Sequence, residues 1–83
     1  MTMAQVYVLI VTRYNCKRNV STYLLGFDKI DNVNELYGQY DIIISIKGKD
    51  MNEIEEFIAN NIRTNKEIQQ TNTLVVSDIP TSE

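Results

Sequence analysis

The chain of 83 residues contains no histidine, no tryptophan and a single cysteine, Cys16. Without a histidine to activate it, this thiol cannot form the Cys–His pair of a nucleophilic enzyme. The same counts exclude a metal cluster built from cysteine and histidine, and they exclude a disulfide within the chain. A lone cysteine is typical of a reducing compartment, so we expect a cytoplasmic protein.

Glycine and proline are also scarce, with three residues and one residue, and the scattered glycines form no phosphate-binding loop. No apolar run is long enough for a transmembrane helix, so we expect no membrane contact. The net charge of −3 at pH 7 argues against direct binding of nucleic acid, which needs a basic surface. The acidic residues fall mostly on one predicted helix, where a solvated face explains them, and we expect neither a metal nor a cofactor.

Four segments have the composition of β-strands. Residues 4–12 (AQVYVLIVT) are apolar on both faces, which indicates a strand covered on both sides. Residues 29–37 (KIDNVNELY) are rich in Asp and Asn, and we expect this weaker strand at a sheet edge. Residues 40–47 contain four β-branched isoleucines, and residues 68–77 (IQQTNTLVVS) predict the last strand.

A first helix is predicted after a polar loop at residues 13–19. The apolar residues at the spacing of one helix face are Val20, Tyr23, Leu24 and Phe27. Asn15 or Asn19 is expected to cap its start, and Gly26 is expected to end it in a left-handed conformation. Cys16 is interpreted as a small residue at the helix start. The basic residues Arg13, Lys17 and Arg18 are predicted to form a small cluster there, which we interpret as a solvated loop in preference to an anion site at the helix N-terminus.

A second helix is predicted to begin at Asp50, which forms a capping-box pattern with Glu53 three residues later. Acidic residues lie early in this helix, and Arg63 and Lys66 lie at or beyond its end, in agreement with the helix dipole. Its apolar stripe consists of Met51, Ile54, Phe57, Ile58 and Ile62.

The predicted order is β-α-β-β-α-β, the ferredoxin-like α+β sandwich with a four-stranded antiparallel sheet and two helices on one face. Right-handed crossovers are expected to place the first and last strands at the centre and the hairpin strands outside. Helices cover only one face of the sheet, so Tyr7, Leu9 and Val11 would form an exposed apolar patch on the other. We therefore expect a dimer in which two such faces meet, burying on the order of 1,600 Å² or more.

The hairpin between the second and third predicted strands contains a glycine and a carboxylate. Gly38 is predicted to be the pivot of a tight turn, because glycine adopts a positive φ without strain. Asp41 lies beside isoleucines, where a carboxylate is costly to bury unless donors bind it. Two interpretations stay open: Asp41 accepts N–H bonds within its own turn, or it faces the amino group of a ligand. Thr71 and Thr73 are either ordinary strand residues or ligand contacts.

Four segments taken together resemble one family: the strand AQVYVLIVT, the hairpin GQYDIIISIK, the helix ending in EEFIANNIR and the closing QQTNTLVV. Their order and spacing, over about residues 4–77, resemble the ligand-binding domain of the Lrp/AsnC transcription regulators, also called the RAM domain. The most specific part is the hairpin at residues 38–41 followed, after a helix, by residues 71–73. Full regulators of this family have a helix-turn-helix domain before this one, and we expect residues 1–83 to be a single RAM domain without it.

The resemblance implies dimers formed by sheet-to-sheet packing, rings of dimers that are often octamers, and small effectors, typically amino acids, held between dimers. Asp41 would accept from the ammonium of the ligand, and backbone N–H groups near Gly38 would face its carboxylate. Thr71 and Thr73 would form the opposite wall. The ligand-binding residues that it implies are Gly38, Gln39, Tyr40, Asp41, Thr71 and Thr73.

We therefore expect a non-enzymatic module for amino-acid binding and oligomerisation in transcription regulation. Its expected partners are a second copy, a higher ring and full-length Lrp/AsnC regulators. One alternative is an assembly module that co-assembles with such regulators without an effector. The other is a small dimeric ferredoxin-like enzyme, which the fold alone permits but which the lack of an activated nucleophile argues against.

Overall fold

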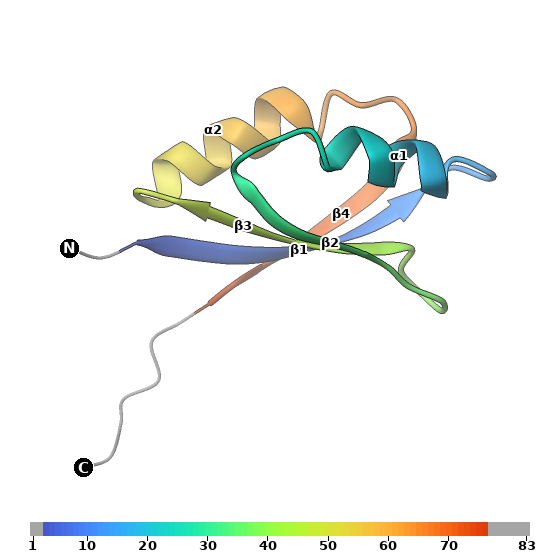
Figure 1. Ribbon diagram of the computed structural model, residues 1–83, viewed down its shortest axis with the longest axis horizontal. Coiled ribbons are helices and arrows are strands. Elements are labelled where there is room, and N and C mark those ends of the chain that lie inside the picture. The colour runs from blue at the N-terminus through green and yellow to red at the C-terminus, as the bar shows by residue number, and fades with distance from the viewer. Residues whose placement is uncertain (1–2, 77–83) are drawn as a thin grey trace, which may run out of the picture.

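The computed structural model describes residues 3–76, so residue 77, the expected end of the last strand, lies outside the described part. The elements are β1 (Ala4–Thr12), α1 (Lys17–Leu24), β2 (Ile30–Glu35), β3 (Ile42–Gly48), α2 (Met51–Asn61) and β4 (Ile68–Val75). All neighbouring strands are antiparallel, and both helices lie on one face of the sheet (Figure 1). The predicted ferredoxin-like sandwich is confirmed. Neither described helix is long and apolar enough to cross a membrane.

The strands lie in the order β2-β3-β1-β4, so β1 and β3 are central. The prediction that the first and last strands lie at the centre was wrong, because β4 forms an edge. Each helical crossover joins two parallel strands, β1 to β2 and β3 to β4, with one strand of the other unit between them. This interlocking puts the isoleucine-rich β3 inside and leaves the edges to the more polar β2 and β4.

The hydrophobic core lies between the sheet and the two helices. Val8 of β1 lies opposite Ile44 of β3, and both side chains are buried. Alternation along the strands sends every second residue to this face. The buried core consists of Val6, Val8, Ile10, Val20, Leu24, Ile30, Ile42, Ile44, Ile46, Ile54, Phe57, Ile58 and Ile62. The apolar stripes of both helices therefore meet one face of β1 and β3 in a single core.

The start of α1 differs from the prediction. Cys16 occupies the N-cap position, as expected of a helix-start residue, but no side chain caps the helix. Asn15 has a φ of 64° and lies in the turn that leaves β1, a left-handed conformation that asparagine tolerates. Asn19 lies inside the helix. Neither asparagine is therefore the predicted cap.

The end of α1 also differs, because Gly26 does not have the predicted positive φ. Its N–H donates to the Tyr23 carbonyl (3.2 Å), and the N–H of Phe27 donates to the Leu24 carbonyl (3.3 Å). These i to i−3 bonds tighten the last turn without a left-handed residue. Phe27 then packs edge-to-face against Tyr23 and Phe57, with ring centroids 5.2 Å apart in both pairs.

The capping pair predicted for α2 is confirmed. The Asp50 carboxylate accepts from the Glu53 N–H (2.9 Å). In a capping box the Glu53 carboxylate would accept from the N–H of Asp50, but here it accepts from the N–H of the preceding residue, Lys49. The Glu53 carboxylate also forms an ion pair with Lys29 (2.8 Å). The helix therefore begins where the sequence pattern indicates.

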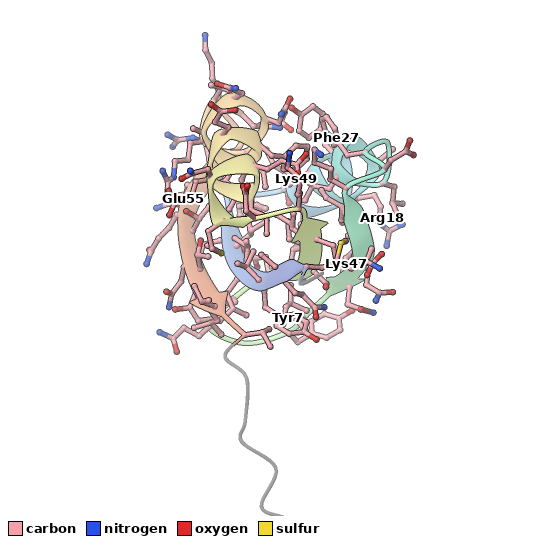
Figure 2. The ribbon with its side chains drawn as sticks, turned by 90° about the vertical axis from the view of Figure 1, so that its left-hand side faces the viewer. Tyr7, Arg18, Phe27, Lys47, Lys49 and Glu55 are labelled. Atoms are coloured by element: carbon pink, nitrogen blue, oxygen red, sulfur yellow. The ribbon has the colours of Figure 1, made fainter. Side chains whose placement is uncertain are left out.

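The second face of the sheet is not covered by either described helix, and we refer to it as the open face. Figure 2 places Tyr7 below the sheet and Phe27 above it, on the side of the helices. Tyr7 is 39% exposed and Leu74, its partner on β4, is 47% exposed. The apolar residues of the open face are Tyr7, Leu9, Val11, Ile43 and Leu74.

Candidate functional site

The connection between β2 and β3, residues 36–41, is wider than the predicted tight turn. The strands pair as far as Glu35 and Ile42, and the Leu36 N–H then closes the base of the loop on the Asp41 carbonyl (2.7 Å). Gly38 has a φ of 126°, so the predicted positive φ is confirmed. A Cβ at this position would meet nothing within 4 Å, so glycine is required here by backbone conformation and not by space.

Asp41 fixes the loop to the end of β1. Its Oδ2 accepts from the Thr12 N–H (2.8 Å) and from the Thr12 hydroxyl (3.2 Å), and its own N–H donates to the Ile10 carbonyl (2.8 Å). These partners lie on another strand, so Asp41 does not bind within its own turn. Within residues 3–76 no donor contacts its Oδ1, and the side chain is only half-buried. One carboxylate oxygen is therefore held while the other can accept from a ligand.

The backbone N–H groups of residues 37–40, which we call the loop amides, have no acceptor among the described residues. Gly38, at the centre of this run, is exposed. Consecutive backbone N–H groups in a turn can bind an anion without any basic side chain. The loop thus combines a free carboxylate oxygen with free N–H donors.

Asn72, which sequence reasoning missed, is the residue of segment 71–73 that reaches this loop. Its side-chain amide donates to the Tyr40 hydroxyl (3.3 Å). In register, Asn72 lies opposite Leu9 on the open face, whereas Thr71 and Thr73 lie opposite Ile10 and Val8 on the helix side. The structure therefore brings Tyr40 and Asn72 together and does not bring Thr71 or Thr73 to Tyr40. Strand alternation was the signal that could have identified Asn72.

The three basic residues near the start of α1 do not form the predicted cluster. Arg13 donates through Nε to the Lys66 carbonyl (2.8 Å), and Arg18 pairs with Glu35 (2.8 Å). Lys17 donates to the Leu36 carbonyl (2.8 Å). Arg13 therefore contacts the segment before β4, whereas Lys17 and Arg18, both in α1, contact the end of β2 and the residue after it.

Glu35, at the end of β2, is held from α1. The Arg18 guanidinium donates two hydrogen bonds to its carboxylate (2.8 and 3.0 Å), and the Ser21 hydroxyl donates a third (2.6 Å). These donors favour the ionised form and lower the pKa of Glu35 to about 2. The loop therefore starts from a strand end that α1 holds in place.

A cavity of about 270 Å³ lies at the other end of β1. Its lining side chains carry no formal charge, so it offers no counter-charge to an amino acid. It is lined by Met3, Ala4, Gln5, Met51, Val75 and Val76. No group of three or more metal-ligating side chains occurs within residues 3–76. The loop 36–41 is therefore the better candidate site.

The family model of the Lrp/AsnC ligand binding domain matches residues 5–83. The solved structure of FFRP-DM1 is 28% identical, with a TM-score of 0.86 over 89% of this chain and 99% of that chain. Hypothetical protein PHS023 from Pyrococcus horikoshii is also 28% identical, with a TM-score of 0.86 over 92% of each chain. A transcriptional regulator from Neisseria meningitidis, solved as a complex with L-Met, shares the fold at 15% identity, with a TM-score of 0.82 over 95% of this chain and 53% of that chain.

Comparison with curated proteins finds no match. The match of the family model nevertheless extends over nearly the whole chain, and it agrees with the resemblance seen in the sequence. The described fold is the one that these solved relatives share. The chain belongs to the family of Lrp/AsnC ligand-binding domains.

Proposed function

We propose that this domain is a regulatory module that binds a small amino acid at the loop 36–41. The observation that carries the proposal is the pairing of a fixed carboxylate with unpaired backbone donors. An amino acid is a zwitterion, and its ammonium needs an anionic acceptor while its carboxylate needs N–H donors. Asp41 Oδ1 supplies the first, and the loop amides around Gly38 supply the second.

The remaining loop residues would then face the side chain of the effector. Gln39 is exposed on the loop, and Tyr40 is half-buried with its hydroxyl held by Asn72. We assign the wall opposite the loop to Asn72. Thr71 and Thr73, which lie on the helix side, would support this wall from the flanking strand positions without touching the ligand.

L-Methionine is the first probe, because the neisserial relative of the same fold was solved as a complex with L-Met. Calorimetric titration of L-methionine, followed by the other amino acids, tests the proposal on the wild type and on Asp41→Asn. The asparagine keeps an oxygen for Thr12 and loses the charge that faces the ammonium, so affinity should fall by about tenfold or more.

Asp28→Asn is the matched control, since Asp28 is an exposed carboxylate outside the loop and the net charge changes equally. It should bind as the wild type does. If the wild type binds no amino acid at millimolar concentration, or if Asp41→Asn binds unchanged, the proposed effector site is wrong.

We also propose that a second copy of the chain covers the open face. Tyr7 and Leu74 are large apolar side chains with 39% and 47% of their surface exposed, side by side on neighbouring strands. Burying such a patch stabilises association at roughly 25 cal/mol per Å² of apolar surface before the cost of association is subtracted. Dimers of this kind would be the unit of a larger ring, an octamer in the first instance, and of mixed assemblies with full-length Lrp/AsnC regulators.

Sedimentation at micromolar concentration tests this assembly. The wild type should sediment as a dimer or larger, and Tyr7→Glu should shift it to the monomer by placing a charge in the interface. Tyr14→Glu is the control, because Tyr14 is 90% exposed in the turn after β1. A well-folded wild-type monomer would contradict the assembly. Association without amino-acid binding would favour the purely structural module.

A further inference from the structure

Helix α1 begins with two cations, Lys17 and Arg18. Positive charge at a helix N-terminus opposes the helix dipole, and α1 has neither an acidic residue in its first turn nor a side-chain cap to compensate. The charge at this end of the helix is therefore unfavourable unless a partner outside the helix compensates it. The side chains of Lys17 and Arg18 instead contact the end of β2 and the start of the loop.

The N-terminal part of α1 contacts three consecutive residues, the last residue of β2 and the first two of the loop. Arg18 and Ser21 bind the Glu35 carboxylate. Lys17 donates to the Leu36 carbonyl at 2.8 Å. Its Nζ also lies 4.6 Å from the centroid of the Tyr37 ring. We call Lys17, Arg18 and Ser21 the α1 clamp.

The α1 clamp holds the beginning of the loop, and Asp41 holds its end through Thr12. Between these two anchors the loop amides remain without acceptors in the described structure. The Leu36 carbonyl is the group that a tight turn over residues 36–39 would use as acceptor for the Gln39 N–H. Lys17 occupies one of the two lone pairs of this carbonyl and holds the carbonyl toward α1, which disfavours closure of the loop into a tight turn.

We propose that Lys17 is a positioning residue of the loop: its ammonium holds the Leu36 carbonyl and keeps the loop amides free to bind an anionic group. The link to effector binding rests on the proposed function. The positioning of the loop does not, because it concerns contacts within the chain. Arg18 and Ser21 support Lys17 by fixing Glu35, the residue before Leu36.

Three variants test this role. Lys17→Met removes the ammonium and keeps an unbranched side chain, and Lys17→Arg restores a cation that can donate to the carbonyl. Lys29→Met is the matched control, because Lys29 is a half-exposed lysine that pairs with Glu53 on α2, away from the loop. The first readout is amide hydrogen exchange at Leu36, whose N–H closes the base of the loop.

In Lys17→Met, exchange at Leu36 should become about tenfold faster, while core amides such as that of Val8 keep their wild-type rates. Lys17→Arg should restore slow exchange at Leu36, and Lys29→Met should not alter it. L-Methionine affinity, measured by titration, should fall by a similar factor in Lys17→Met alone. A purely structural role would instead speed exchange throughout the core.

Equal exchange at Leu36 in Lys17→Met and Lys29→Met would overturn the positioning role, and so would failure of Lys17→Arg to restore it. Failure of wild-type protein to bind L-methionine or any other amino acid would refute the proposed function, while the exchange rates would still decide the role of Lys17. Unchanged L-methionine affinity in Lys17→Met, with faster exchange at Leu36, would overturn the link between loop position and binding.

Discussion

Asp41 joins the loop to β1, and its replacement by alanine should destabilise the fold even without a ligand. The Thr12 N–H and hydroxyl both donate to Asp41 Oδ2, and Thr12 is only 7% exposed. Removing the carboxylate leaves two donors at a nearly buried site without their acceptor. A hydrogen bond to a charged group contributes about 1.5–3 kcal/mol, and the longer hydroxyl contact adds less than about 1 kcal/mol. We therefore expect Asp41→Ala to lower the free energy of unfolding by about 2–3 kcal/mol.

Two further variants separate the hydrogen bonds from the charge. Asp41→Asn keeps an oxygen in the place of Oδ2 and should cost less than about 1 kcal/mol. Thr12→Val removes the hydroxyl and keeps the backbone N–H, and it should cost about 0.5–1.5 kcal/mol. Asp28→Asn, at an exposed position, should be neutral within about 0.5 kcal/mol.

Urea denaturation followed by far-UV circular dichroism measures these differences. With a urea m-value of about 1 kcal/mol/M for a domain of this size, the Asp41→Ala midpoint should fall by about 2–3 M. All variants must be compared at one protein concentration, since association shifts apparent stability. If Asp41→Ala loses less than about 0.5 kcal/mol, or if Asp41→Asn loses as much as Asp41→Ala, the contact with Thr12 does not anchor the loop.

Two other predictions concern Glu35 at the end of β2 and Gly48, which lies against the start of α2. Because the pKa of Glu35 is lowered to about 2, its ionised form stabilises the fold above the usual carboxyl pKa, and this contribution is lost as the pH falls toward 2. Glu35→Gln should therefore flatten the dependence of Tm on pH between about 5 and 2. Glu56→Gln is the control. An unchanged slope in Glu35→Gln, or the same flattening in Glu56→Gln, would contradict the stabilising role of ionised Glu35. A Cβ at Gly48 would lie 2.8 Å from the Ile54 side chain, so Gly48→Ala should cost about 1–3 kcal/mol in thermal unfolding. Gly26→Ala, with its nearest atom at 3.5 Å, is the control and should cost less than about 1 kcal/mol.

Local sequence patterns predicted the elements because each pattern reports which face of an element is buried. The alternation of Val6, Val8 and Ile10 gave the bounds of β1, and Asp50 with Glu53 gave the start of α2. The same patterns carry no information about which strands are neighbours. That choice depends on how the two crossovers interlock, and for this reason β4 was wrongly expected at the centre of the sheet.

The width of the loop could not be predicted for a related reason. Gly38 identifies a residue with positive φ, but the position where pairing stops depends on Asp41 binding to Thr12 on another strand. The contact of Lys17 with Leu36 likewise joins residues from two elements. The one local signal was the unfavourable placement of a cation at a helix start, which indicates a partner outside the helix without naming it.

The contact between Tyr40 and Asn72 connects the proposed effector site with the proposed assembly. Asn72 belongs to the open face, where it lies opposite Leu9, and its amide holds the Tyr40 hydroxyl of the loop. A second copy that covers the open face would restrict Asn72 and therefore Tyr40, so association should favour one arrangement of the loop. Linkage is reciprocal, and a dimer holds two copies of the effector site. Saturating L-methionine should therefore tighten association by the square of the factor by which association tightens binding at each site, in total about 5-fold or more. Sedimentation across a dilution series, with and without saturating L-methionine, measures that factor. Tyr40→Phe removes the acceptor of Asn72 and should reduce this factor toward one. Equal dissociation constants for the wild-type dimer with and without L-methionine would show that the effector site and the open face act independently.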